Sequence, residues 1–265
     1  MGDMNSPHPS APDHKDSVAS PSNSDPKISR SDCGDDISSS HRRWDFDGLD
    51  PLTFEKHAGK SIPLYQEGHD LICDLSAFFT PESGSVLDIG CSTGRLLKSL
   101  VARHAHRKDL KFLGIDQSQT MVEWAESQSN DPRLKWSCED INTAAVEKHD
   151  LIISYYTVQF VPPRLRQELI NRLYESLNWG GALILFEKVR GPDARFQDIL
   201  TQLYTDYKIK QGYGAEEIIN KTQSLKGILE PFSSQGNLDL MKRAGFVDIT
   251  TVQRYLCFEG FLAIK

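Results

Sequence analysis

Long apolar runs are missing from this chain of 265 residues. No stretch approaches the roughly 20 residues needed to cross a bilayer, and the N-terminus lacks the apolar region of a signal peptide. The five cysteines include no C-x-x-C pair, a pattern that predicts free thiols in a reducing compartment. We therefore expect a cytoplasmic protein with no membrane partner.

Clustered positive charge is also scarce. Lys and Arg number 30 against 37 Asp and Glu, which gives a net charge of -7, and the only dense basic cluster is His41-Arg42-Arg43. Because affinity for phosphates comes mainly from clustered Lys and Arg, we expect no direct nucleic-acid partner. Three histidines, His104, His106 and His149, show no metal-ligand spacing, so no metal site is predicted.

The first 43 residues are rich in Ser, Pro, Asp and Asn and have almost no aliphatic side chains. Such a segment buries too little apolar surface to offset its ordering entropy, so residues 1–43 are predicted to form a disordered tail. The Ser6-Pro7 and Ser20-Pro21 pairs leave open a targeting or phosphorylated arm. Residues 44–265 are predicted to form a single folded domain, since 38% hydrophobic content can fill one substantial core.

The folded part is organised around Val86–Arg95, where an apolar strand runs into a turn of small residues and then into a helix. Gly90 and Gly94 permit backbone angles and close approaches that a Cβ would forbid. The free N–H groups of the following helix point toward whatever the loop holds. This is the shape of a βα turn that binds a nucleotide.

Further apolar strands alternate with amphipathic helices, which predicts an α/β protein with a mostly parallel sheet covered on both faces. A helix over Leu238–Ala244, ended by Gly245, precedes two strands close enough to pair as an antiparallel hairpin, Phe246–Val252 and Phe258–Ile264. Residues 191–235 are predicted to be a helical lid over the carboxyl ends of the strands. The predicted fold is therefore Rossmann-like and seven-stranded. Its other strands are Val86–Ile89, Lys111–Asp116, Leu134–Cys138, Asp150–Ser154 and Ala182–Glu187, and its other helices cover about 70–79, 96–104, 118–125 and 164–177.

Polar residues at the strand ends suit a nucleotide. Asp116 ends the second strand, 22 positions after Gly94, where an acid can accept hydrogen bonds from ribose hydroxyls. Asp140 and Ile141 follow the third strand and could contact a purine. A dinucleotide and S-adenosylmethionine both remain possible on these features. The third glycine of the dinucleotide fingerprint falls on Arg95, and a terminal hairpin does not belong to a dinucleotide-binding sheet, so S-adenosylmethionine is favoured.

Three motifs resemble those of class I S-adenosylmethionine-dependent methyltransferases: Asp-Ile-Gly-Cys-Ser-Thr-Gly at 88–94, Gly-Ile-Asp-Gln-Ser at 114–118 and Leu-Asn-Trp-Gly-Gly-Ala-Leu at 177–183. Within that superfamily, residues 44–265 are similar to the carboxy-S-adenosyl-L-methionine synthases. The specific matches are Ser-Ile-Pro-Leu-Tyr at 61–65, Val-Gln-Phe at 158–160, Phe-Glu-Lys at 186–188, Asp-Tyr-Lys at 206–208 with Gly-Tyr at 212–213, and Lys-Arg-Ala-Gly-Phe at 242–246.

The resemblance implies S-adenosylmethionine as cofactor and a homodimer. Members of this family convert S-adenosylmethionine and prephenate into a sulfonium with an added carboxylate, which serves wobble-uridine modification of tRNA. The family holds that carboxylate with an arginine shortly after the Gly-Tyr pair, and the position falls on Thr222 here. Neither threonine nor a nearby lysine (Lys221 or Lys226) offers the planar fork of a guanidinium.

The absent arginine leads to three hypotheses. The main one is a methyltransferase that uses ordinary S-adenosylmethionine on a small-molecule acceptor. The alternative is a carboxy-S-adenosyl-L-methionine synthase despite Thr222, and the third is a catalytically silent cofactor-binding partner of another enzyme.

Candidate site residues follow from the motifs. The cofactor site is predicted to consist of Tyr65 (by resemblance), Asp88, Gly90, Cys91, Ser92, Gly94, Asp116, Gln117, Asp140, Ile141 and Tyr155. The substrate is predicted to contact Tyr156, Gln159, Tyr204, Tyr207, Tyr213 and Thr222, although an aromatic set at helical spacing also suits a core. Glu187, at the tip of the fifth strand, is the predicted group for orienting or deprotonating an acceptor.

Overall fold

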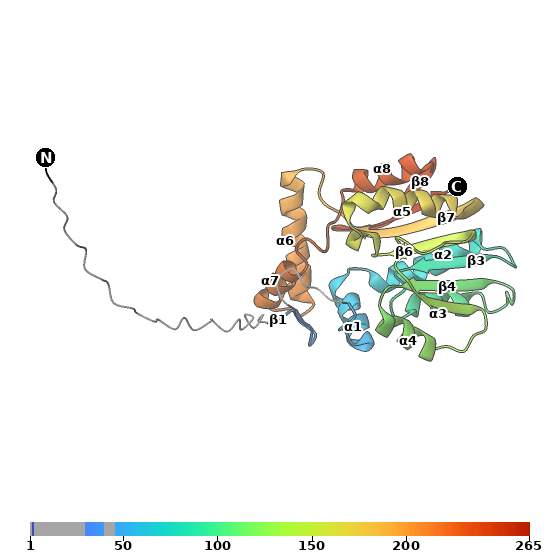
Figure 1. The fold of residues 1–265 in the computed structure, drawn as a ribbon, viewed down its shortest axis with the longest axis horizontal. Coiled ribbons are helices and arrows are strands. Elements are labelled where there is room, and N and C mark those ends of the chain that lie inside the picture. The colour runs from blue at the N-terminus through green and yellow to red at the C-terminus, as the bar shows by residue number, and fades with distance from the viewer. Residues whose placement is uncertain (1, 3–29, 40–45) are drawn as a thin grey trace.

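A computed structural model describes residues 2, 30–39 and 46–265. Its main sheet has seven strands in the order β5-β4-β3-β6-β7-β9-β8 (Figure 1). The first five strands in this order are parallel, and β9 runs antiparallel to both β7 and β8. The predicted Rossmann-like sheet with its terminal hairpin is confirmed. The strands are β3 (Ser85–Ile89), β4 (Lys111–Asp116), β5 (Leu134–Cys138), β6 (His149–Tyr155), β7 (Leu177–Lys188), β8 (Asp248–Tyr255) and β9 (Phe258–Ile264).

Side-chain caps begin several of the helices. Asp50, Ser118, Asp193 and Ser233 each accept a hydrogen bond from a main-chain N–H in the first turn of the helix that follows. Gly245, at φ +119°, ends the last helix in a left-handed conformation. The helices are α1 (Pro51–Ser61), α2 (Tyr65–Phe79), α3 (Arg95–Arg103), α4 (Gln119–Ser127), α5 (Pro163–Glu175), α6 (Ala194–Lys210), α7 (Ala215–Ser224) and α8 (Ser234–Ala244), with a 3-10 turn at Val158–Phe160.

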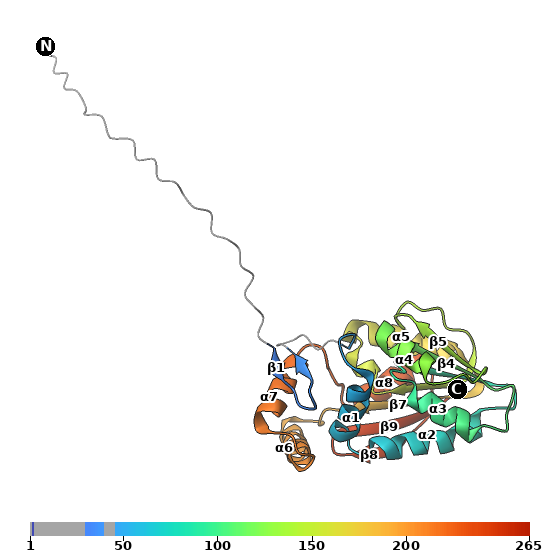
Figure 2. The same cartoon turned by 90° about the horizontal axis from the view of Figure 1, so that it is seen from below.

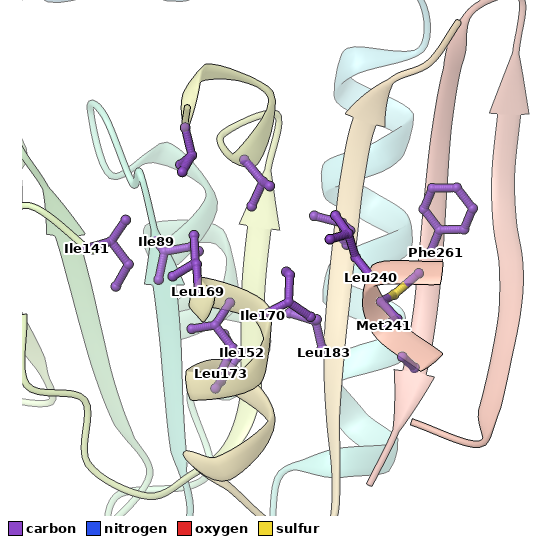
Figure 3. Packing of buried hydrophobic residues seen from close by; sticks show 14 of the residues in the cluster. Ile89, Ile141, Ile152, Leu169, Ile170, Leu173, Leu183, Leu240, Met241 and Phe261 are labelled. Carbon is purple, nitrogen blue, oxygen red and sulfur yellow. The ribbon is translucent and has the colours of Figure 1, made fainter. Parts of the chain in front are cut away.

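The core lies on both faces of the sheet because alternate strand residues point to opposite faces. Leu183 and Leu185 of β7 pack with α5 and α8, whereas Ile184 and Phe186 pack with α2 and α3. Figure 3 shows the first of these clusters, in which Leu169 and Ile170 lie against the sheet. Strands buried on both faces explain the nearly continuous apolar runs in the sequence.

The long strand β7 departs from prediction at its start. The helix expected to run to Leu177 ends at Glu175, and Leu177 already belongs to a strand of 12 residues. The glycines expected to precede the strand are inside it, where Gly180 N–H donates to the carbonyl of Lys265 and Gly181 accepts from its N–H. Within the described ranges, no helix is long and apolar enough to cross a membrane.

Helices α6 and α7 stand together at one end of the sheet, beside a small N-terminal hairpin (Figures 1 and 2). This hairpin, residues 30–39, pairs β1 (Ser31–Asp32) with β2 (Ser38–Ser39). The prediction of disorder over residues 1–43 is therefore wrong for 30–39. Cys33 and Ile37 are buried against Leu225 and Ile228, so this segment finds apolar partners that its own composition does not reveal. The rest of the predicted tail lies outside the described residues, apart from Gly2.

Candidate functional site

A cavity of about 1100 Å³ lies at the carboxyl ends of β3, β4, β6 and β7, the end at which open α/β sheets bind ligands. Helices α1, α6 and α7 supply further parts of its wall. Typical ligand pockets measure roughly 300–1,000 Å³. This cavity therefore has room for a nucleotide-sized ligand together with a second, smaller molecule.

The turn after β3, residues 90–94, is called the glycine loop below, and its backbone lies close to neighbouring side chains. Gly90 has φ +69°, and a Cβ there would lie 2.3 Å from the Thr157 Oγ1 atom. Ser92 also has a positive φ of 49°, and its N–H donates to the Asp116 Oδ2 atom at 2.8 Å. Asp116 accepts a second main-chain bond, from the N–H of Ser118 at 2.9 Å. Asp116 thus holds the loop in shape as well as lining the cavity.

Asp88 presents a buried carboxyl group to the same cavity. It is 2% exposed, and its Oδ1 atom has no hydrogen-bond partner in the part of the chain that the structure describes. Burial, and secondarily the nearby Asp116, raises the pKa of Asp88 well above its usual value. A buried carboxyl oxygen without a partner in the protein indicates a ligand that supplies a donor or a positive charge.

Three tyrosines form one wall. The rings of Tyr65 and Tyr155 lie 5.2 Å apart, those of Tyr155 and Tyr156 lie 4.6 Å apart, and the Tyr155 hydroxyl donates to the Tyr65 carbonyl at 2.6 Å. Tyr156 has φ +62°, and Leu64, which precedes α2, has φ +56°. Bulky residues rarely adopt this region, and such strain concentrates at functional sites. Nothing in the sequence pattern signals it.

The structure brings most of the predicted cofactor residues to this cavity. Ten of them line it: Tyr65, Asp88, Gly90, Cys91, Ser92, Asp116, Gln117, Asp140, Ile141 and Tyr155. Gly94 does not. It caps α3 at φ +70°, and a Cβ there would lie 2.2 Å from the Trp136 ring, so this glycine serves helix packing.

The predicted substrate residues divide into two groups. Tyr156, Gln159, Tyr204 and Thr222 line the cavity. The Gln159 amide, however, donates to the Tyr156 carbonyl and accepts from the Lys188 N–H, so it supports the wall from inside. Likewise, the Thr222 hydroxyl donates to the Ile218 carbonyl of its own helix.

Tyr207 and Tyr213 are not placed at the main cavity, which corrects two predicted contacts. Tyr207 stacks on Tyr204, with ring centroids 6.3 Å apart. Tyr213 is buried behind α1, where its hydroxyl contacts Asp35, His57 and Ser61. Both lie on the helical insertion, and sequence spacing alone could not show which of its faces meets the cavity.

Glu187 is a further correction, because it is buried away from the cavity. It is 1% exposed and lies near Arg166 and the main-chain N–H groups of Val158 and Gln159. Burial raises its pKa well above the usual value. Side chains alternate along a strand, so at the end of β7 it is the next residue, Lys188, that reaches the cavity.

Four lysines line the cavity, and none of them was among the predicted site residues: Lys188, Lys208, Lys221 and the exposed Lys226. The Lys188 and Lys208 ammonium groups lie 4.4 and 4.8 Å from the centre of the Tyr204 ring. Burial and the neighbouring lysines lower the pKa of Lys208 to about 8 and that of Lys221 to about 7. Among the described residues, neither Lys188 nor Lys208 makes an ion pair with a carboxylate.

Such lysines are unusual, because buried lysine is rare without a partner. The sequence held one usable signal, the alternation that points Lys188 inward. The burial of Lys208, which is 7% exposed, depends on tertiary contacts that no local pattern reveals. In the same described ranges, no group of three or more His, Cys, Asp or Glu side chains is placed to hold a metal ion.

Comparison with known proteins agrees with this geometry. A methyltransferase domain family matches residues 86–181. The carboxy-S-adenosyl-L-methionine synthase of Staphylococcus epidermidis is 35% identical over 212 residues, which are 80% of this chain and 92% of that protein. The synthase of Campylobacter lari is 32% identical over 226 residues, 84% of this chain and 95% of that protein.

Solved structures share the fold at low identity. Human N-acetylserotonin methyltransferase, solved with SAM, has a TM-score of 0.54 and 18% identity, covering 81% of this chain and 54% of that one. A protein of Bordetella parapertussis has a TM-score of 0.62 and 16% identity, covering 82% and 80%. With relatives at this identity and coverage, the chain belongs to the class I S-adenosylmethionine-dependent methyltransferase superfamily and, within it, to the carboxy-S-adenosyl-L-methionine synthase family.

Proposed function

We propose that this enzyme is a carboxy-S-adenosyl-L-methionine synthase, which uses S-adenosylmethionine and a small carboxylate, prephenate, to form a carboxylated sulfonium. Two lines of support meet here. The relatives that match most of the chain carry this name, and the cavity holds a group of lysines suited to a carboxylate. The lysine group is the observation that carries the proposal.

The glycine-loop side of the cavity fits S-adenosylmethionine. Gly90 leaves the loop open to a nucleotide, Asp116 and Asp140 offer carboxylates to hydroxyl or amino donors, and Ile141 offers an apolar plate. Asp88 and its unpartnered Oδ1 atom suit a ligand that carries positive charge. When bound, S-adenosylmethionine supplies a methyl group on a positively charged sulfur. The protein's part is to hold that sulfur beside a second substrate and to exclude water.

The lysine group lines the same cavity as the loop. Lys188 comes from the end of β7, Lys208 from α6 and Lys221 from α7, so three separate elements direct ammonium groups to one region. Because burial and mutual repulsion disfavour their charged forms, an anion that neutralises them would bind with a strong charge-assisted contact. On this proposal, the lysine ammonium groups bind the carboxylate in place of the arginine that the family resemblance implies.

One observation favours the second candidate, methyl transfer to a neutral acceptor. Thr222 stands at the cavity where the family resemblance places an arginine, and its hydroxyl is used by its own helix. A neutral residue there leaves the added carboxylate without bidentate bonds. The lysines outweigh this observation, because a neutral acceptor gives two buried ammonium groups nothing to pair with.

The product distinguishes the candidates. The enzyme is incubated with S-adenosylmethionine and prephenate, and the nucleoside products are weighed by mass spectrometry. We expect a sulfonium heavier than S-adenosylmethionine by one carboxyl group, formed only when prephenate is present. Demethylated cofactor as the sole product, with a methylated acceptor from a screen of small molecules, would replace the synthase by a methyltransferase.

A further inference from the structure

The N-terminal hairpin places one carboxylate at the back of the cavity wall. Asp35 has a side chain that is 3% exposed. Its Oδ2 atom lies 3.0 Å from His57 Nδ1 of α1, and its Oδ1 atom accepts from the Lys60 ammonium at 2.6 Å. The Tyr213 hydroxyl donates to Oδ2 as well. Asp35 therefore ties the hairpin to α1 and to the chain between α6 and α7.

The protonation states along this contact follow from its chemistry. Burial alone would raise the pKa of Asp35, but the hydrogen bonds from Lys60, Tyr213 and His57 lower it to about 2, so Asp35 is ionised. Burial, followed by the charge of Lys221, lowers the pKa of His57 to about 3, so the imidazole is neutral. A carboxylate only accepts, and the proton of His57 must therefore sit on Nδ1. This leaves the Nε2 atom as an acceptor.

Lys221 lies on the acceptor side of that imidazole. Its ammonium donates to His57 Nε2 and, at 2.9 Å, to the Ser61 hydroxyl. The contacts form a chain from Asp35 through His57 to Lys221, with Ser61 one helical turn beyond His57 on the same helix. His57, Ser61 and Lys221 all line the cavity, whereas Asp35 does not.

We propose that Asp35 is a positioning residue for substrate binding: through the tautomer of His57, it fixes the Lys221 ammonium at the part of the cavity wall where the carboxylate binds. This inference rests on the proposed function, since it assigns the lysines a carboxylate ligand. It makes the N-terminal hairpin part of the substrate site.

A purely structural role for the contact explains less. The hairpin is already anchored by Cys33 and Ile37, which are buried against Leu225 and Ile228. Burying an ionised carboxylate beside an imidazole and an ammonium costs desolvation energy, and such groups often add nothing to stability over apolar residues. Asp35 and His57 instead fix the direction of a hydrogen bond made by the Lys221 ammonium. Lys221 in turn faces Lys208 from α6 and Lys188 from β7.

The test compares Asp35→Asn with Asp36→Asn. Both changes remove one negative charge from the same turn, both residues have a positive φ that asparagine tolerates, and Asp36 is exposed. An amide at position 35 can donate to His57 Nδ1, which reverses the tautomer and removes the acceptor for Lys221. We expect Asp35→Asn to raise the KM for prephenate by roughly tenfold or more, with the affinity for S-adenosylmethionine and the kcat changed less than about threefold.

Asp36→Asn is expected to behave as the wild type. A KM that is unchanged in Asp35→Asn, with only a lower melting temperature, would show that the hairpin has a structural role alone and would overturn the positioning proposal.

A second measurement separates this proposal from the proposed function. Nitrogen-15 spectra of the imidazoles, with His57 assigned from a His57→Gln variant, report which ring nitrogen carries the proton. We expect the neutral Nδ1–H form of His57 at pH 7 in the wild type and in Asp36→Asn, and its loss in Asp35→Asn. Absence of a carboxylated product would remove the proposed function but leave this result standing, whereas an unaltered His57 tautomer in Asp35→Asn would remove the relay.

Discussion

The two sides of the cavity are built in different ways. The nucleotide side consists of the glycine loop, Asp88, Asp116 and Asp140, and each of these lies in or directly after one of the first three strands of the main sheet. The lysine side consists of Lys188, Lys208 and Lys221, which come from a strand end and two helices of the insertion. Residues at the ends of consecutive parallel strands form the first side, whereas tertiary packing of the insertion against the sheet forms the second. On the proposed function, the first side binds S-adenosylmethionine and the second side binds the carboxylate substrate.

The largest effect is expected from a substitution in the glycine loop, on the nucleotide side of the cavity. Gly90→Ala places a Cβ 2.3 Å from Thr157 Oγ1 in a residue at φ +69°. Overpacking of this kind costs about 1–3 kcal/mol and is relieved by a shift of the loop backbone that lines the cavity. We expect calorimetry to find the affinity for S-adenosylmethionine reduced roughly 100-fold or more.

Gly180→Ala is the matched control, because Gly180 has φ +78° and no described atom lies within 4 Å of its ideal Cβ. It carries the same backbone penalty at a place remote from the cavity. If the two variants lost the same amount of cofactor affinity, close approach at Gly90 would not be the reason for that glycine.

An intermediate effect is expected on the lysine side. Lys208→Met keeps most of the buried aliphatic volume and removes the ammonium group. A hydrogen bond to a charged group contributes about 1.5–3 kcal/mol, so the KM for prephenate should rise roughly tenfold to hundredfold while the affinity for S-adenosylmethionine stays the same. Steady-state kinetics with the carboxylated product as readout measure both. An equal loss of cofactor affinity would contradict the division of the cavity into two sides.

Lys210→Met on the same helix, where the side chain is exposed, controls for the loss of charge. The pH dependence gives an independent check. The pKa of Lys221 is lowered to about 7 and that of Lys208 to about 8, so raising the pH through this range removes positive charge. The KM for prephenate should therefore increase between about pH 7 and pH 9, and the component near pH 8 should be missing in Lys208→Met.

The same contrast explains how much the sequence could predict. The seven strands and the terminal hairpin follow from periodicity. Nine of the ten predicted cofactor residues that line the cavity follow from their places at strand ends, and the tenth, Tyr65, follows from the family resemblance. The contact of Asp35 with His57 joins a segment of low apolar content to a helix, and it depends on a fold already formed. Tyr213 carries a polar hydroxyl, yet it is buried in that network rather than in the cavity. Local patterns state which elements form, but they do not state which face of the insertion turns inward.

The smallest expected effect concerns Glu187, the group that the strand-end pattern singled out for catalysis. Burial raises its pKa well above the usual value, which favours the neutral carboxyl group, and glutamine resembles that form in charge and shape. We expect Glu187→Gln to change the kcat and both KM values by less than about threefold, with an unchanged melting temperature.

Glu259→Gln is the contrasting buried variant, since the Glu259 carboxylate accepts hydrogen bonds from Ser234 and Thr251 and should lose stability with its charge. A loss of turnover of roughly 100-fold in Glu187→Gln, with the melting temperature maintained, would mean that the carboxyl acts on the reacting atoms. In that case Glu187 would have to reach the cavity through a movement of the Val158–Phe160 turn, whose N–H groups cover it. While the turn stays in place, Lys188 points into the cavity and Glu187 points into the core, because successive side chains of β7 face opposite sides of the sheet.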